Sequence, residues 1–268
     1  MAGVRFATGF LLPVASLWWR ELVRFYRQKS RVAGVLASPL VFWFLIGSGL
    51  GSSFRSAASP HRGGYLEYFF PGTLALILLF TSIFCMMSVI EDRREGFLLS
   101  VLVAPIPRSA LVLGKVLGGA TLALLQALIF LLAAPAVGIA LFPAQAILIV
   151  GILFLHAIGL TGLGFLIAWG LDSTQGFHAL INLLLVPLWM LSGALFPPSG
   201  ASSWIRWVMK LNPLSYGLAA LRHGLYLRDP ARGTEMPSLP VSLAVTAAFS
   251  ALTLVAALVM VRGRTSRT

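Results

Sequence analysis

The stretch "YFFPGTLALILLFTSIFCMMSVIEDRRE" (residues 68–95) places a long apolar run directly before three of the chain's eight acidic residues. No charged residue interrupts the run from Tyr68 to Ile90, and a helix needs about 20 largely apolar residues to cross a bilayer. A strand of a transmembrane barrel would instead alternate apolar and polar residues over about ten positions. The stretch therefore predicts a membrane-spanning helix that ends in a cluster of charge.

The composition extends this prediction to the whole chain. Of its 268 residues, 58% are hydrophobic and only 10% are charged, which is more apolar surface than one soluble core can bury. We expect an all-α membrane protein whose six transmembrane helices fill residues 32–268. The six largely apolar runs are Val32–Ser52, Tyr68–Ile90, Ala110–Leu141, Ala144–Leu171, Ala179–Phe196 and Leu239–Val261.

Residues 1–31 are predicted to form an amphipathic helix at the membrane surface. Apolar and basic residues of "LLPVASLWWRELVRFYRQKSR" recur at helical spacing on opposite faces. The apolar face holds Leu11, Ala15, Trp18, Leu22 and Phe25, and the basic face holds Arg20, Arg24, Arg27 and Arg31. This helix is either a lipid anchor or a contact for a cytoplasmic partner, and the two roles are compatible. The segment after Arg5 resembles a signal peptide only crudely, so we expect it to be retained.

The distribution of Lys and Arg predicts the orientation. With six spans both termini share one side, and the basic residues gather in the segments of that side. Short cytoplasmic segments carry the excess of Lys and Arg, so both termini are expected in the cytoplasm. The net charge of +12 follows from charges that flank spans, which favours membrane lipids as partners and gives no support for nucleic acid.

The sequence lacks the common signatures of chemistry. No GxxxxGK[ST] phosphate loop, HExxH motif or GxSxG elbow occurs, and the four histidines are scattered. The single cysteine, Cys85, lies within a predicted span. We therefore expect no enzyme activity, no metal site and no cofactor in this chain.

The acidic residues bear on the energy source. They fall at span edges, in loops or in the N-terminal helix, whereas ion-coupled carriers commonly hold ionisable groups within the membrane. A stand-alone carrier or channel remains the alternative from another class, and an inverted repeat would be its sign. A membrane assembly factor that does not transport is a third possibility.

The charged end of the opening stretch leads into a second short helix. Glu91 and Asp92 end the span, "GFLLSVLV" is apolar and helical in length, and Pro105 and Pro107 stop it. Such a helix would lie crosswise at the cytoplasmic surface. From the residues alone, an ordinary interfacial elbow is the favoured interpretation, with the arginines held by lipid headgroups and the acids solvated.

Three blocks resemble the ABC type-2 permeases, the family that includes daunorubicin-resistance and nodulation-factor export permeases. "REGFLLSVLVAPIPRSALVLGK" is similar to their cytoplasmic loop signature, with Phe97 where Thr is usual and Leu99 where an acid is frequent. The matching positions are Arg94, Glu95, Gly96, Leu98, Pro105, Arg108, Gly114 and Lys115. "LSGALFPPSG" from Leu191 resembles the end of the family's fifth span, and "LNPLSYGLAALR" from Leu211 resembles the loop before its last span.

The resemblance implies a homodimeric permease of an ABC exporter in a prokaryotic inner membrane. Two separate ATPase subunits would hold ATP and Mg and drive an amphipathic, lipid-like or drug-like molecule outward. Residues 91–105 would be the coupling helix seated in the ATPase, with the N-terminal helix beside it. The implied coupling residues are Glu91, Asp92, Arg93, Arg94, Glu95, Gly96, Phe97 and Leu98.

The resemblance also implies short re-entrant helices in the external region, residues 197–235, broken at Asn212 and Pro213. The residues selected there are Trp204, Trp207, Asn212, Pro213 and Tyr216, although the tryptophans also fit an ordinary aromatic belt. Polar residues within spans either hydrogen-bond a neighbouring helix or contact cargo. The conduit candidates are Asn182, Ser192, Thr81, Ser82 and Gln126. Lys115 is expected to extend its ammonium to the cytoplasmic surface.

Overall fold

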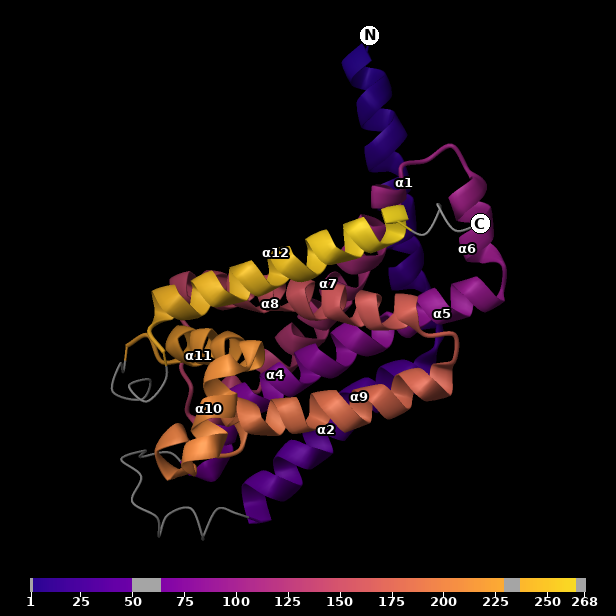
Figure 1. Ribbon diagram of the computed structural model, residues 1–268. Helices are drawn as coiled ribbons and strands as arrows, with labels where there is room; N and C mark the ends of the chain where they lie inside the picture. Colours follow the sequence, from indigo (N-terminus) through magenta and orange to yellow (C-terminus); the bar gives the residue numbers. More distant parts are fainter. Residues whose placement is uncertain (1, 50–63, 229–236, 264–268) are drawn as a thin grey trace.

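The computed structural model describes residues 2–49, 64–228 and 237–263, and every regular element in these ranges is a helix (Figure 1). The long helices run roughly side by side, so the bundle has two ends. The α6 end holds α5 (Met87–Arg94) and α6 (Phe97–Val103), and the α10 end holds α10 (Ser203–Leu211) and α11 (Pro213–Leu225). These two names are used below.

Five helical segments are long and apolar enough to cross a membrane. They are Tyr65–Arg94, Arg108–Leu131, Pro143–Gly170, Thr174–Ala194 and Leu239–Arg262. The first of them comprises α4 (Tyr65–Cys85) and α5; the others contain α7 (Arg108–Leu131), α8 (Pro143–Gly170), α9 (Thr174–Trp189) and α12 (Leu239–Gly263). The predicted first span, Val32–Ser52, corresponds to α2 (Lys29–Gly49), which packs against α4 but has a shorter apolar part, Pro39–Gly49. Ser52 lies outside the described residues.

Two of the predicted apolar runs end earlier as regular helices. The third run was predicted to reach Leu141, but α7 ends at Leu131 and a short 3-10 turn, Ala134–Val137, follows. Proline lacks an N–H and clashes with the preceding turn of a helix, so Pro135 falls outside α7. The fifth run ends earlier as a regular helix, because a π-helical segment, Met190–Ala194, follows α9 with Gly193 at a positive φ of 88°.

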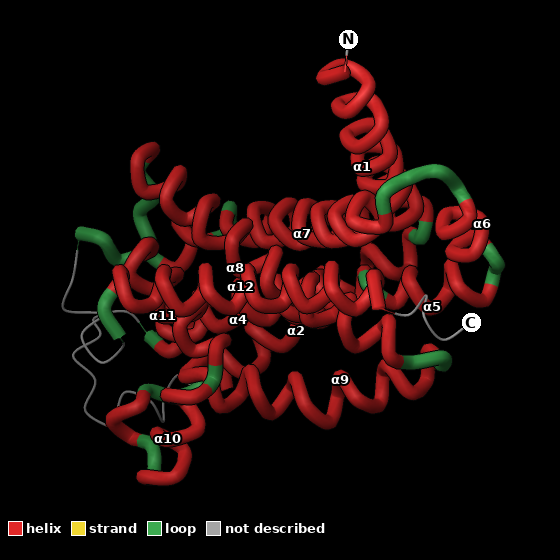
Figure 2. The backbone as a smooth tube through the Cα atoms, turned by 45° about the horizontal axis from the view of Figure 1, so that its top comes forward, coloured by secondary structure: helices red, strands yellow, loops and turns green. Residues whose placement is uncertain are grey.

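The N-terminal helix α1 (Ala2–Arg27) is shorter at its end than the predicted 1–31. The helix is interrupted at Gln28, and α2 begins at Lys29. Arg31 therefore belongs to α2 and not to the N-terminal helix. Figures 1 and 2 show α1 crossing the end of α7 at a steep angle to the bundle. This crosswise direction fits a helix that lies along a membrane surface.

α4 is apolar on all sides and nearly all of its residues are buried, so it lies at the centre of the bundle, where it contacts α2, α7, α8 and α11. Small residues allow the other helices to approach closely. Gly159 and Gly162 of α8 lie directly against α12, where an added Cβ would meet Phe249 and Thr253 within 3.0 Å. Interfaces between membrane helices are commonly enriched in such small residues.

The contact between α1 and α7 depends on two more glycines. A Cβ at Gly114 would lie 2.6 Å from the Cβ of Leu17 and 3.1 Å from the carbonyl oxygen of Val14. A Cβ at Gly118 would lie 2.8 Å from the Cβ of Glu21. Neither neighbour is the free end of a side chain, so α1 itself would have to move away from α7.

We therefore predict that Gly114→Ala and Gly118→Ala lower the unfolding free energy by about 1–3 kcal/mol through overpacking. Gly151→Ala in α8 is the matched control, because its added methyl meets no atom within 4 Å. That control should be neutral or slightly stabilising, since Ala is the better helix former. Thermal unfolding of the three variants in one detergent measures the difference, and equal midpoints would contradict a close α1–α7 contact.

Candidate functional site

The α6 end contains a sharp corner between two short helices. α5 continues the direction of α4, and Gly96 at φ 77° turns the chain into α6. Glycine adopts this left-handed conformation without a Cβ penalty. Glu91 and Asp92 belong to α5, and the short helix after the corner spans Phe97–Val103 and not the whole of the predicted 91–105.

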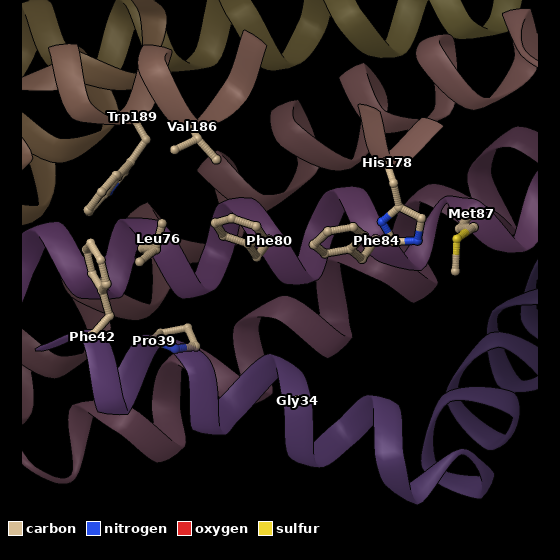
Figure 3. A pocket seen from close by; sticks show the side chains of 10 residues that line it. All are labelled: Gly34, Pro39, Phe42, Leu76, Phe80, Phe84, Met87, His178, Val186 and Trp189. Atoms are coloured by element: carbon tan, nitrogen blue, oxygen red, sulfur yellow. The ribbon is translucent and has the colours of Figure 1, made fainter. Parts of the chain in front are cut away.

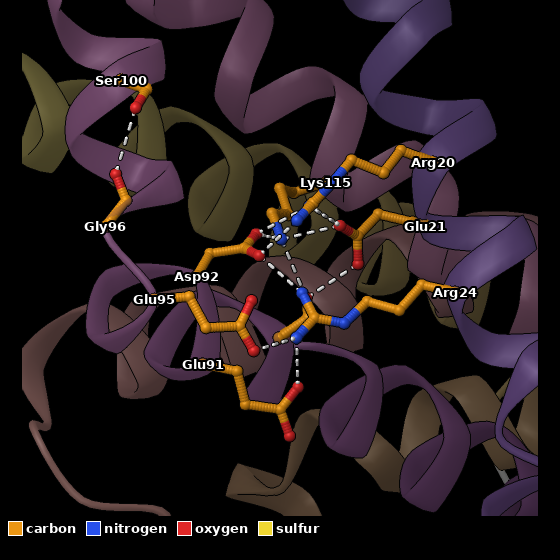
Figure 4. Close-up of polar contacts among 10 residues, drawn as sticks. Arg20, Glu21, Arg24, Glu91, Asp92, Glu95, Gly96, Ser100 and Lys115 are labelled. Carbon is orange, nitrogen blue, oxygen red and sulfur yellow. Dashed lines mark hydrogen bonds and ion pairs between the residues drawn. The ribbon is translucent and has the colours of Figure 1, made fainter.

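Behind this corner lies a buried charged cluster, which we define as Arg20, Glu21, Arg24, Glu91, Asp92 and Lys115 (Figure 4). At its centre the Lys115 ammonium of α7 pairs with Asp92 of α5 and, at 2.7 Å, with Glu21 Oε1 of α1. All three side chains are almost completely buried. Ser88 donates to Glu21 Oε2 at 2.7 Å, so the cluster joins three helices through one set of ion pairs.

Two arginines of α1 complete the cluster. Arg20 forms a bidentate pair with the Asp92 carboxylate, with N–O distances of 2.7 and 3.0 Å. Arg24 donates to Asp92 and, at 2.8 Å, to Glu91 Oε2. Bidentate arginine–carboxylate pairs are stronger and more directional than single ones. Burial lowers the pKa of Arg20, but the hydrogen bond and charge of Asp92 outweigh burial and raise it above its ordinary value.

Arg93 and Arg94 of α5 contact the other side of the bundle, at the end of α8 and the turn that follows it. Arg93 donates to the carbonyl oxygens of Trp169 and Leu171 at 2.9 and 3.1 Å and pairs with Asp172 at 2.8 Å. Cations are favourable beside the unpaired carbonyls at a helix C-terminus. α5 is thus tied to α1 and α7 on one side and to the turn between α8 and α9 on the other.

α6 connects to the charged cluster through one aromatic ring and presents an apolar face outward. The Arg20 guanidinium lies 3.6 Å from the centre of the Phe97 ring, a cation–π contact. Leu98 is buried and anchors α6 to the bundle, whereas Leu99 and Val103 are 67% and 79% exposed. Their i, i+4 spacing places them on one face, a signal that the sequence carried but that we did not use in the prediction.

The structure places the predicted coupling and interface residues in three environments. Asp92 and Leu98 are buried, Glu91, Arg93 and Phe97 are half-buried, and Arg94, Glu95 and Gly96 are exposed. Of the interface arginines, Arg20 and Arg24 join the cluster, and Arg27 is exposed. The expectation that Lys115 reaches the surface was wrong, because the carboxylates of Glu21 and Asp92 hold its ammonium inside the bundle.

A second feature is a cavity of about 490 Å³ between α2, α4 and α9 (Figure 3). Its lining is apolar and aromatic, with His178 as the polar contribution. The lining residues are Gly34, Pro39, Phe42, Leu76, Phe80, Phe84, Met87, His178, Val186 and Trp189. No charged residue lines it among the described residues, so it suits an uncharged, apolar molecular body. The sequence analysis did not single out His178.

The structure does not gather the five conduit candidates at this cavity. Thr81 donates to Gln126 inside the bundle, and the Ser82 hydroxyl is also buried there. Ser192 donates to the Trp189 carbonyl at 2.6 Å. Asn182 alone is exposed, on the outer face of α9.

The predicted break in the external region is present. α10 ends at Leu211 and α11 begins at Pro213, with Asn212 between them. The Asn212 side chain accepts from the Leu214 N–H at 3.0 Å and donates to the Leu188 carbonyl at 2.6 Å, which caps α11 and ties it to α9. Trp204 and Trp207 are exposed, and the Tyr216 hydroxyl donates to the Lys210 carbonyl. Residues 229–235 of the predicted region lie outside the described part.

The five apolar helices of spanning length, together with a match to a transporter family, make this an integral membrane protein of the transport-permease class. The chain belongs to the ABC-2 type transporter family, whose model matches residues 13–226. Members of this family normally work with an ATPase partner.

Relatives in three algae agree with this assignment, and each bears the name "Putative transport permease ycf38". The protein of Cyanophora paradoxa is 30% identical over 73% of this chain and 68% of its own length. The protein of Porphyra purpurea is 23% identical over 78% of this chain and 72% of its own length. The protein of Pyropia yezoensis is 22% identical over 81% and 75%, respectively.

The charged cluster makes a specific stability prediction. Lys115→Met removes the buried cation and leaves Glu21 with only the longer 3.4 Å contact to Arg20, so we expect a loss of about 3–5 kcal/mol in unfolding free energy. Lys29→Met, at an exposed lysine, should change it by less than about 0.5 kcal/mol. Denaturant unfolding in detergent measures both.

A double variant, Lys115→Met with Glu21→Gln, adds a test of the pairing itself. Two contacting residues have non-additive effects, so the double variant should lose less stability than the two single losses combined. Strict additivity would contradict the ion pair.

Proposed function

We propose that this protein is the membrane-spanning permease of an ATP-driven ABC exporter. Two copies form a homodimeric conduit in a prokaryotic inner membrane, and two separate ATPase subunits bind ATP and Mg. The conduit moves an amphipathic, lipid-like or drug-like molecule outward. The family membership supports the general function, and the geometry of the α6 end carries the mechanism.

The main support for this mechanism is that α6 has an exposed apolar face on one side and contacts the charged cluster on the other. Leu99 and Val103 offer a contact for a partner, and Phe97 lies against Arg20 of the charged cluster. A push on α6 by the closing ATPase would therefore reach α1, α5 and α7 together. Packed elements transmit such rigid-body motions without chemistry in the moving chain.

The basic residues at the α6 end support an orientation of the bundle in the membrane. Arg20, Arg24, Arg93 and Arg94 all lie there, and cytoplasmic segments carry the excess of Lys and Arg. We assign the α6 end to the cytoplasm and the α10 end to the outside. With six crossings that include α2, both termini are cytoplasmic.

The outer face of α9 supports the homodimeric conduit. Gln175, His178 and Asn182 are exposed there at helical spacing, beside the apolar cavity. Polar side chains of spanning helices face protein or water rather than lipid. A second copy placed against α9 would shield these groups from lipid and enclose the cavity as a path for amphipathic cargo.

The ATPase contact is tested by Leu99→Asp and Val103→Asp, which place a charge on the exposed face of α6. Each should abolish co-purification of a co-expressed partner ABC ATPase and leave the permease folded. Leu132→Asp is the matched control, because Leu132 at the far end of α7 is 79% exposed, as is Val103. The readout is the ATPase-to-permease ratio after size-exclusion chromatography.

Retention of the ATPase by both α6 variants would contradict the proposed contact. An absence of bound ATPase with the unchanged chain would favour a stand-alone carrier or channel. ATPase binding without stimulation of its turnover by any amphipathic compound would favour the assembly factor.

The homodimer is tested by disulfide formation in a Cys85→Ala background, which removes the one native thiol. Asn182→Cys should form covalent dimers on oxidation in native membranes. Leu252→Cys, exposed near the middle of α12, is the control and should stay monomeric. Dimers from Leu252→Cys, with none from Asn182→Cys, would show an interface at α12 and would contradict the proposed interface at α9.

A further inference from the structure

A second pocket of about 500 Å³ lies at the α10 end, between the segment that follows α9, α10 and the start of α11. Its lining differs in kind from that of the apolar cavity. The lining residues are Ser192, Pro198, Ser199, Arg206, Met209, Lys210, Ser215 and Pro237. We call it the external pocket below.

The external pocket is cationic. Arg206 and Lys210 contribute two positive charges one helical turn apart on α10, and no carboxylate lines the pocket among the described residues. Neither side chain forms an ion pair with any described residue; Arg206 donates only to the Ser203 hydroxyl, at a long 3.4 Å. Two cations without carboxylate partners favour an anionic ligand.

A buried hydroxyl in the same pocket also lacks a partner. Ser215 is 4% exposed, and its Oγ makes no hydrogen bond in the described structure. Buried polar atoms are nearly always hydrogen-bonded, so an orphan hydroxyl that lines a pocket indicates a missing ligand or water. Ser215 is also in the first turn of the 13-residue helix α11, whose N-terminus carries partial positive charge.

The opposite face of α10 shows where this pocket sits relative to a bilayer. Trp204, Trp207 and Leu211 are 63%, 67% and 76% exposed on that face. Exposed tryptophans beside lysine and arginine are typical of the membrane–water interface. The external pocket therefore opens at the depth of lipid headgroups, next to apolar side chains that can enter the hydrocarbon.

From these observations we infer that the external pocket binds the phosphate headgroup of an amphiphile at the outer leaflet. A phosphate offers several acceptor oxygens to Arg206, Lys210 and Ser215 at once, and charge-assisted hydrogen bonds of this kind are strong. The apolar part of the molecule would lie along Trp204 and Trp207. Both a bilayer phospholipid and an exported phosphate-bearing cargo have this chemistry.

Three probes, titrated into the full chain purified in maltoside detergent, distinguish binding of the phosphate group from binding of the acyl tails. Dioctanoyl phosphatidic acid carries phosphate and tails, dioctanoylglycerol carries the same tails without phosphate, and glycerol 3-phosphate carries phosphate without tails. Isothermal titration calorimetry measures each affinity. We expect phosphatidic acid to bind at least about tenfold more tightly than dioctanoylglycerol, since one charge-assisted hydrogen bond is worth about this factor.

Variants place the binding in the external pocket. Lys210→Gln and Arg206→Gln should each weaken phosphatidic acid binding about tenfold, and Ser215→Ala should weaken it less. Lys210→Arg keeps the charge and should retain binding. Its behaviour shows that the loss in Lys210→Gln comes from the missing charge and not from misfolding. Arg228→Gln is the matched control, because this exposed arginine lies over Phe142, outside the external pocket.

The outcomes are distinct. Binding of glycerol 3-phosphate as well as of phosphatidic acid would support a site that also accepts soluble phosphate esters of a cargo. Binding of phosphatidic acid without binding of glycerol 3-phosphate would support an outer-leaflet phospholipid as the ligand. Equal affinity for phosphatidic acid and dioctanoylglycerol, or unchanged affinity in Lys210→Gln and Arg206→Gln, would overturn the inference.

Discussion

The buried carboxylate of Asp92 is the constraint on which the α6 end of this protein depends. A carboxylate removed from water is costly unless charged partners surround it. Arg20, Arg24 and Lys115 supply those partners from two other helices. α1 must therefore dock against α5 and α7 for the bundle to be stable, and the glycines of α7 provide the room for it.

In our proposal this constraint gives the charged cluster a mechanical role that surface charges could not have. Exposed ion pairs are weak and exchange readily with water, whereas a buried, fully paired set fixes the relative positions of its helices. We propose that ATP binds to separate ATPase subunits and not to this chain. The ATPase must then drive the permease through direct contact. The rigid corner of α5 and α6 is the described element best suited to receive it.

Continuous apolar runs such as Tyr68–Ile90 and Leu239–Val261 were predictable from the sequence, because spanning a bilayer leaves a strong local signal. The partners of Lys115 were not predictable, since Glu21 is 94 residues away and helix packing alone brings the two together. An isolated lysine near a span end is expected to extend to the surface, which explains the error. The break after Arg27 carried no glycine or proline signal, so the interface helix was predicted too long.

The candidate functional residues also divide into those predictable from local sequence and those that depend on packing. The charged residues of the corner and the break at Asn212 were identified from short motifs, because their meaning is local. The exposed pair Leu99 and Val103, the cavity residue His178 and the orphan hydroxyl of Ser215 depend on which face of a helix the fold covers. That property is set by neighbours distant in sequence, so the sequence alone gave little guidance.

The central claim is that α1 and α6 move as one rigid unit when the ATPase closes. The most direct measurement is the spin-label distance between Val23→Cys on α1 and Ser100→Cys on α6, in a Cys85→Ala permease–ATPase complex with only one labelled protomer. A second pair, Ser100→Cys with Leu183→Cys on α9, reports movement relative to the conduit. Our account predicts that ATP binding leaves the α1–α6 distance unchanged and shifts the α6–α9 distance. A change in the α1–α6 distance would contradict it.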